Sequence, residues 1–150
     1  MSREISRLER GFMTQSAEFI LHRGCFACGR HAADGLGLEF KQNGQSLCCS
    51  VTLDSKFQSY GGIIHGGILA TVADAAMVNL VFRRYGGSPV TGSLNIRYRH
   101  PVRANKKIVV IASVRRARLG SVWTVCRIMA GDTLCVDAEA IFRIRSDRAE

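Results

Sequence analysis

A carboxylate and a pair of glycines lie close together in one apolar stretch of this sequence. Residues 58–82 read QSYGGIIHGGILATVADAAMVNLVF, and Asp74 follows the run His65-Gly66-Gly67. An unpaired carboxylate is costly to bury, so a charge kept on an apolar helix is either paired or used. Glycines at a helix start let a ligand approach the free N–H groups of the first turn. Such donors suit the developing negative charge of an acyl-transfer oxyanion.

Asp74 and Gly66 cannot act on one reacting carbonyl from the same helix. Asp74 lies eight residues after Gly66. That separation corresponds to about 12 Å along a helix axis. A reacting carbonyl must lie within about 3 Å of both its oxyanion donors and the attacking group or water. Two antiparallel copies of the helix, one from each subunit of a dimer, meet this requirement, so we expect a site shared between subunits.

The helix that carries both groups is predicted to start at Gly66 and to run for about 17 residues. Apolar residues cover almost its whole circumference, which is typical of a buried helix. These residues are Ile68, Leu69, Val72, Ala73, Ala76, Met77, Leu80 and Val81. The pair Gly86-Gly87 is expected to end the helix.

Strand-like runs lie on both sides of this helix. Before it, residues 36–41 and 47–53 flank the turn signal Asn43-Gly44-Gln45, which predicts a hairpin. After it, four more strands are predicted, at residues 89–100, 107–116, 121–129 and 133–145. This order predicts an α+β fold in which one antiparallel six-stranded sheet wraps around the long central helix.

The first residues of the chain differ in pattern from the rest. Residues 3–22 have an amphipathic pattern that predicts an extra N-terminal helix, so we divide the chain into a helical extension at 1–24 and one domain at 25–146.

The hydrophobic content of 47% in 150 residues predicts a packed core. No uncharged apolar run reaches ~18 residues, so no membrane span is expected. The charged start lacks the apolar region of a secretory signal, which favours a cytoplasmic protein.

The net charge of +9 comes from 21 Lys and Arg against 12 Asp and Glu. A basic surface could bind nucleic acid through counterion release, or it could receive an anionic small molecule. The charges are scattered over several predicted strands, without a basic helix or an aromatic-interleaved RNA motif. We therefore expect an anionic small molecule and neither nucleic acid nor membrane as a partner.

Two cysteines and two histidines recur every third residue in one glycine-containing segment. They are His22, Cys25, Cys28 and His31. These are zinc-ligand types, and CxxC is a common half-site, but no second CxxC occurs elsewhere. Gly24 and Gly29 indicate a loop whose histidines could simply be exposed. We favour the loop, and expect no metal, no cofactor and reduced thiols.

Two motifs together point to one known family. His65-Gly66-Gly67 is followed by Asp74 nine positions after the histidine, and a later run, TGSLNIRYRHP, extends from Thr91 to Pro101. The chain resembles the hotdog-fold acyl-CoA thioesterases of the PaaI type, in which HGG, an acidic residue at this spacing and N-I-x-Y-x-x-P recur. The resemblance covers residues 25–145. It implies the hotdog fold and hydrolysis of an acyl-CoA thioester to a free acid and CoA.

The resemblance also implies roles for the residues of the central stretch. Asp74 is expected to act as nucleophile or as a general base on water, and Gly66 to donate its N–H to the thioester oxygen from the opposite subunit. Each has a structural alternative, since Asp74 could be satisfied by a neighbouring polar side chain and Gly66 could serve tight helix–sheet packing. His65 is expected to position groups near the thioester, and Gly67 to let the substrate approach.

Other residues follow the family pattern less directly. Many relatives have an asparagine six positions before the histidine, where this chain has Ser59, so Gln58 is the proposed substitute. Thr91 matches a hydroxyl residue that helps to hold the attacking water in some relatives. Arg118 and Ser121 lie at a strand junction where relatives meet the CoA moiety.

The family pattern also suggests an assembly and a competing function. A homodimer with shared sites is implied, and a homotetramer of two such dimers. The alternative function is a non-catalytic acyl-CoA or acyl-carrier binding protein with the same fold.

Overall fold

The computed structural model describes residues 22–146. The predicted N-terminal helix at 3–22, apart from its last residue, lies outside the described residues. The elements, in chain order, are β1 (Lys41–Asn43), β2 (Ser46–Thr52), the 3₁₀ turn η1 (Ser55–Phe57), α3 (Gly66–Tyr85), β3 (Ser88–Tyr98), β4 (Lys107–Arg118), β5 (Ser121–Ala130) and β6 (Thr133–Arg145). The predicted order of two strands, one long helix and four strands is confirmed.

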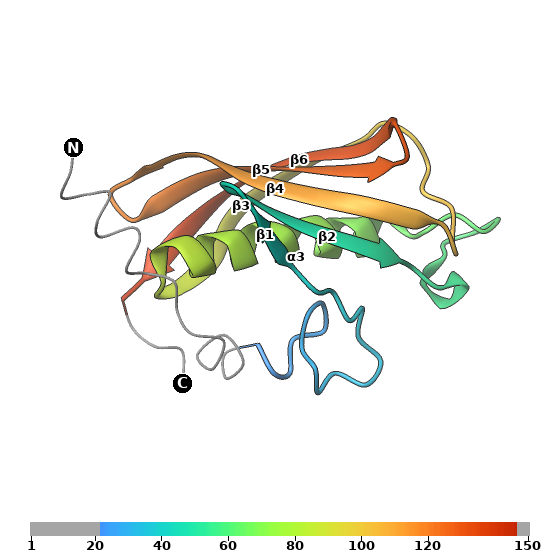
Figure 1. Ribbon diagram of the computed structural model, residues 1–150, viewed down its shortest axis with the longest axis horizontal. Coiled ribbons are helices and arrows are strands. Elements are labelled where there is room, and N and C mark those ends of the chain that lie inside the picture. The colour runs from blue at the N-terminus through green and yellow to red at the C-terminus, as the bar shows by residue number, and fades with distance from the viewer. Residues whose placement is uncertain (1–21, 147–150) are drawn as a thin grey trace.

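The six strands form one antiparallel sheet in the order β1-β2-β4-β5-β6-β3. Figure 1 shows this sheet arched over α3, which is the hotdog arrangement that the sequence predicted. Strand β3 follows α3 directly and pairs only with β6, so it forms one edge of the sheet. Strand β1 forms the other edge.

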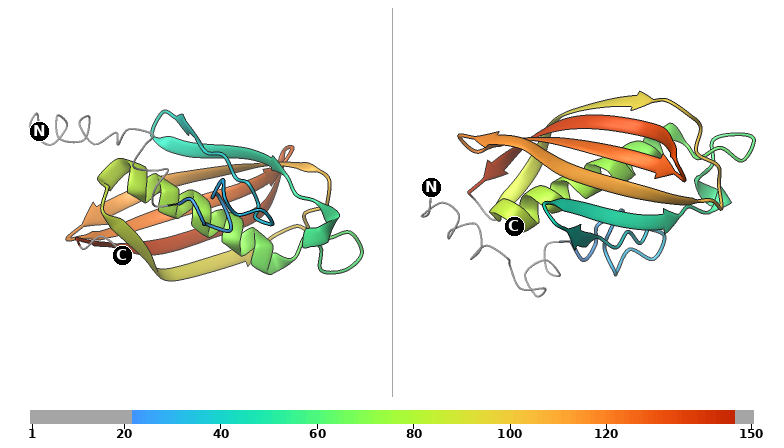
Figure 2. Two further views of the ribbon diagram at one scale, coloured as in Figure 1. Left: turned by 90° about the horizontal axis from the view of Figure 1, so that it is seen from below. Right: turned by 45° about the horizontal axis from the view of Figure 1, so that its top comes forward.

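Helix α3 is buried because it is apolar on every side. Its 20 residues include ten buried ones, among them Val72, Met77 and Leu80. The sheet covers one side, and the segment 22–40 crosses the opposite side, as the left view in Figure 2 shows. By length and hydropathy α3 could also span a membrane, but 56% of that stretch is buried inside the protein. Its apolar composition is therefore accounted for by its place in the core.

The first strand is shorter than predicted. Residues 36–41 were expected to form it, yet β1 contains only Lys41–Asn43. The preceding backbone belongs to the segment 22–40 and bonds within it instead, since the N–H groups of Leu36 and Leu38 donate to the carbonyls of Phe26 and Ala27 at 2.8 and 2.9 Å. The apolar side chains that suggested a strand are buried in the hydrophobic core.

Candidate active site

Asp74 lies in the middle of α3, half-buried, on the side that faces β3. Its Oδ1 accepts a hydrogen bond from the Thr91 hydroxyl at 2.8 Å. Within residues 22–146 no cation pairs with this carboxylate. The helix thus carries a charge that is held by one neutral hydroxyl and is otherwise uncompensated, which is uncommon for a group kept out of water.

A β-bulge explains how Thr91 reaches Asp74. The pairing of β3 with β6 shifts register between Thr91 and Ser93. Strict alternation would place Thr91 on the same face as Ser93, away from the helix, but the extra residue turns it toward α3. The extra residue is Gly92, where a Cβ would lie 3.1 Å from the Ile141 carbonyl oxygen. A glycine at this position therefore allows the bulge that aims the hydroxyl.

The environment of Asp74 changes its acidity. Burial raises the pKa of the Asp74 carboxyl above its ordinary value, and the Thr91 hydrogen bond opposes this rise by stabilising the charged form. A carboxylate with a raised pKa is a stronger base than an exposed aspartate, while it remains ionised over more of the pH range than burial alone would allow. These are the properties of a general base for activating water.

His65 and the two glycines form the start of α3. The Nδ1 of His65 accepts from the Gly67 N–H at 2.9 Å, so the imidazole caps the helix. In the neutral ring Nε2 then carries the proton. A Cβ on Gly67 would lie 3.1 Å from Nδ1, so the glycine gives the ring room to cap. His65 therefore fixes the backbone at the position where Gly66 presents its N–H.

Gly66 is the first residue of α3 and presents a free donor. Its carbonyl accepts from the Tyr98 hydroxyl at 2.8 Å, and the Tyr98 ring lies 3.4 Å from where a Cβ would be. The packing role considered for this glycine is therefore present. Among the described residues nothing accepts from the Gly66 N–H, so the same glycine also has a donor for a ligand. Tyr98 is the tyrosine of the N-I-x-Y-x-x-P run, but no role at the site was expected for it, although its alternation with Ile96 places it on the helix side.

Gln58 and Ser59 lie in the exposed turn that precedes the helix. The Oε1 of Gln58 accepts from the Gly62 N–H at 3.2 Å, while the Ser59 hydroxyl makes a long 3.4 Å contact with the Ile63 carbonyl. The amide NH₂ of Gln58 has no acceptor among the described residues. It is therefore the group in this turn with donors left for a ligand.

Arg118 and Ser121 lie on the other face of the sheet from Asp74. They face each other at the β4–β5 hairpin. Ser121 is buried, and its Oγ accepts from Arg143 Nη1. In one protomer the structure does not bring either residue to the Asp74 carboxylate, and their contact with CoA stays a prediction.

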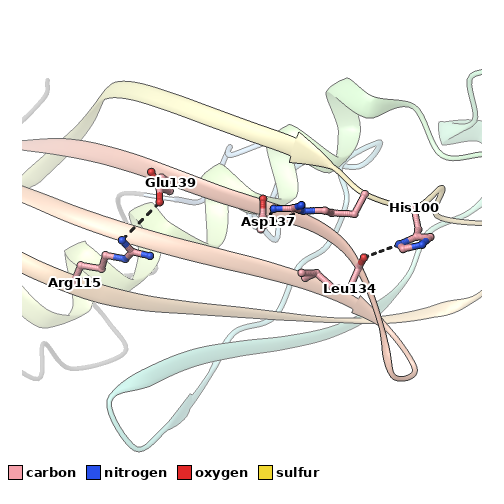
Figure 3. Close-up of polar contacts among 6 residues, drawn as sticks. His100, Arg115, Leu134, Asp137 and Glu139 are labelled. Carbon is pink, nitrogen blue, oxygen red and sulfur yellow. Dashed lines mark hydrogen bonds and ion pairs between the residues drawn. The ribbon is translucent and has the colours of Figure 1, made fainter.

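The same outer face carries four further arginines around one groove. A groove of about 480 Å³ there is lined by arginines of β3, β4 and β5 and by Asp137 and Glu139. Figure 3 shows Arg115 directed at Glu139, at 3.7 Å, and Asp137, whose Oδ2 accepts from Arg99 at 2.7 Å. These carboxylates offset part of the positive charge of the groove.

Three of the predicted site residues, Asp74, Thr91 and Gly66, lie along one helix–strand pair. Asp74 and Thr91 are together at the start of β3, and Gly66 and Tyr98 are together at its end. As the spacing predicted, a single protomer does not bring Asp74 and Gly66 together.

Similarity to known proteins extends over most of the domain. Residues 61–136 match the family model of the thioesterase superfamily. The acyl-coenzyme A thioesterase THEM4 of Bos taurus is 29% identical over 115 residues, which are 73% of this chain and 47% of that protein. The chain spans about half the length of this enzyme and of its Rattus norvegicus counterpart.

Solved structures share the fold. Zebrafish thioesterase superfamily member 2 has a TM-score of 0.73 and 16% identity, covering 89% of this chain and 99% of that one. A phenylacetic acid degradation-related protein from Ralstonia eutropha has a TM-score of 0.70 and 21% identity, and the match covers 84% of this chain and 98% of that one. At such identities the likeness establishes the fold alone.

The buried charge of Asp74 gives a testable effect on stability. The pKa of Asp74 is raised in the folded state, so ionised Asp74 lowers the free energy of unfolding. This loss is fully present above the folded-state pKa and disappears below the pKa that Asp74 has in the unfolded chain. We expect Asp74→Asn to melt at a higher temperature than the parent protein at pH 7. The difference should shrink as the pH falls through the folded-state pKa. Calorimetry across the pH range would measure it, with Asp132→Asn, at an exposed hairpin turn, as the control. A lower melting temperature for Asp74→Asn at every pH would contradict the assignment.

Proposed function

The chain belongs to the thioesterase superfamily, and on this basis we propose that it hydrolyses acyl-CoA thioesters to free acids and CoA. The observation that carries the proposal is the Asp74 carboxylate, half-buried on an apolar helix and held, within residues 22–146, only by Thr91. A structural aspartate in such a place is ordinarily paired with a cation or with several donors. The likeness to acyl-CoA thioesterases of mammals supports the choice of acyl-CoA as substrate.

The second half of the chemistry is assigned to the start of α3. The Gly66 N–H, which has no acceptor in the described part of the chain, lies at the positive end of a 20-residue helix. A developing oxyanion there is stabilised by both the hydrogen bond and the helix dipole. His65, capping through Nδ1, and Gly67 hold this donor in place. The substrate carbonyl would approach at Gly66 and Gly67, where there are no side chains to block it.

A dimer formed through β3 would complete the site. From Thr91 to Tyr98 this edge strand is exposed except at half-buried Ile96, and Leu94 and Tyr98 leave 36% and 54% of their surface uncovered. An exposed edge with large apolar side chains invites pairing with a second strand. Antiparallel pairing of two β3 strands about their centres would place the Thr91 end of one beside the Tyr98 end of the other. Asp74 would then face Gly66 of the partner subunit.

The reaction follows from this arrangement. In the general-base form the Asp74 carboxylate takes a proton from water, whose oxygen bonds to the thioester carbonyl carbon, while Thr91 orients the carboxylate. The partner's Gly66 donates to the oxyanion. The carbon–sulfur bond then breaks, and the CoA thiolate takes up the proton held by Asp74. In the nucleophilic form the Asp74 carboxylate itself bonds to the carbonyl carbon, and the carbon–sulfur bond breaks to release the CoA thiolate. Water then hydrolyses the resulting anhydride to the free acid, and the thiolate takes up the proton that this step leaves on Asp74.

Further contacts are assigned to the exposed turn and to the outer face of the sheet. The free amide of Gln58 is the donor proposed to lie near the thioester sulfur, with Ser59 beside it. Arg118 and Ser121 are proposed to contact the CoA moiety from a neighbouring subunit. A tetramer of two β3-linked dimers in the cytoplasm remains part of the proposal.

The first experiment measures thiol release from short-chain, long-chain and aryl acyl-CoAs. The parent protein should release CoA from at least one of them, and Asp74→Asn should lose at least about 10²-fold in kcat because the base is gone. Its affinity for acyl-CoA should remain, as measured by calorimetry. If the parent binds acyl-CoA without turnover, the non-catalytic binding protein is the correct alternative.

The role of the Gly66 N–H can be isolated with two substitutions. Gly66→Pro removes the N–H at the first helical position, where proline is well tolerated. The preceding His65 has φ −59° and ψ 132°, a conformation compatible with a following proline. Gly66→Ala adds a Cβ at the same place and keeps the donor. We expect Gly66→Pro to lose about 10²–10³ in kcat relative to Gly66→Ala. Equal rates for the two variants would remove Gly66 from the oxyanion site.

Mixing two inactive variants tests the shared site. In a dimer of one Asp74→Asn and one Gly66→Pro chain, one site contains both substitutions and the other contains neither. Random mixing by co-expression should therefore restore about a quarter of the parent activity, since half of the dimers are mixed and half of their sites are intact. A site contained within one chain would give no recovery. Each variant alone, carried through the same procedure, is the control.

A further inference from the structure

Three metal-ligating side chains converge in the segment that crosses α3. His22, Cys25 and Cys28 each offer one ligand atom, and these atoms all lie within 4.8 Å of one another. We propose that they bind a zinc ion that fastens the segment 22–40 to α3. This site is separate from the Asp74 chemistry and does not depend on the proposed function.

The backbone of the segment is folded so that the ligands point to one place. The Cys25 N–H donates to the His22 carbonyl at 3.0 Å, and the Gly29 N–H donates to the Cys25 carbonyl at 2.8 Å. A Cβ on Gly29 would lie 2.4 Å from the Arg23 carbonyl oxygen, so this turn requires glycine. The turn therefore continues from His22 through Gly29, and it brings a histidine that precedes the CxxC motif beside both cysteines.

The spacing of the ligand atoms fits zinc. With Zn–S of about 2.3 Å and Zn–N of about 2.0 Å, tetrahedral coordination places a sulfur and a nitrogen about 3.5 Å apart. The Cys28 Sγ and the His22 Nδ1 lie 3.8 Å apart. Both cysteines are half-buried and neither forms a disulfide. Two thiolates and an imidazole are a ligand set that zinc prefers, with a fourth position for water or another donor.

Asn79 gives a second observation that points to the same place. It is the one buried amide side chain of α3, at 2% exposure, on a helix whose other buried residues are apolar. Its Nδ2 donates to the Ala75 carbonyl at 2.7 Å and lies 3.6 Å from the Cys28 Sγ. An amide donor to a ligand sulfur is the kind of outer contact that orients a metal-bound thiolate and stabilises its charge.

The consequence of the site would be structural. Cys25 and Cys28 pack against the core, and the His22 ring makes an edge contact with Phe82, its centroid 5.4 Å away. A zinc ion would link this contact to Asn79 through Cys28, and so hold the segment on the side of α3 that the sheet leaves open. His31, which the sequence grouped with these ligands, is not part of the cluster, and its Nε2 lies 3.2 Å from Arg23 Nη2.

The test uses the full chain, reduced and freed of metal, with zinc added against a chromophoric chelator. About one zinc ion per chain should bind, and zinc should raise the melting temperature. Cys25→Ser and Cys28→Ser should each lose this binding, while Cys48→Ser, at a half-buried cysteine of β2, should keep it. Asn79→Ala should weaken zinc binding about 10–100-fold.

A second measurement covers the case in which a cysteine variant fails to fold. Cobalt added to the parent protein should give a sulfur-to-metal charge-transfer absorption, which zinc displaces. If the reduced parent binds no zinc and gives no such absorption, the site does not exist. The same holds if both cysteine variants fold and bind zinc as the parent does. None of these results depends on thioesterase activity, so failure of either proposal can be recognised separately.

Discussion

The fold depends on the burial of a helix that is apolar on every side. The sheet covers only one side of α3, so a second layer is needed, and the segment 22–40 provides it. Burying apolar surface contributes roughly 25 cal/mol per Å². The sheet and the segment 22–40 therefore both gain their stability in large part from burying apolar side chains against α3. The polar groups that α3 retains, Asp74 toward β3 and Asn79 toward the segment, lie where each layer meets it.

Two hydrogen bonds align the helix with the edge strand. Thr91 bonds the middle of α3 to the start of β3, and Tyr98 bonds the first residue of α3 to the strand's end, each at 2.8 Å. The strand therefore fixes the relative positions of a carboxylate and a free N–H that are too far apart to act together in one chain. The geometry of the proposed site follows from repeating this unit across a two-fold axis, rather than from any new contact within the protomer.

The main architecture could be predicted because its signals are strong and local. Strand β6 has the predicted span, because its apolar and polar residues alternate clearly. Helix α3 starts at the predicted residue, because two glycines follow a capping histidine there. The first strand was placed wrongly because the apolar side chains of residues 36–40 indicate burial, and burial in an irregular segment gives the same pattern as burial in a sheet. The bulge at Gly92 was not visible either, since alternation alone assigns Thr91 to the wrong face. Tyr98 belongs to the N-I-x-Y-x-x-P run, but its bond to the first residue of α3 joins partners distant in sequence, so the motif does not show it. Asn79 likewise acts through a distant partner, Cys28, and no local pattern marks it.

The strand order has a consequence for how the protein is made. Strand β3 leaves the ribosome directly after α3, but its neighbour in the sheet is β6, the last strand of the described residues. Until β6 emerges, β3 has no partner within its own chain, and pairing between elements so far apart in sequence is slow. Because the bulge that turns Thr91 toward Asp74 is a feature of the pairing with β6, this contact reaches its final geometry only after β6 has emerged. A nascent chain would expose the apolar side of β3 throughout that interval, when it is most open to chaperones or to a neighbouring nascent copy.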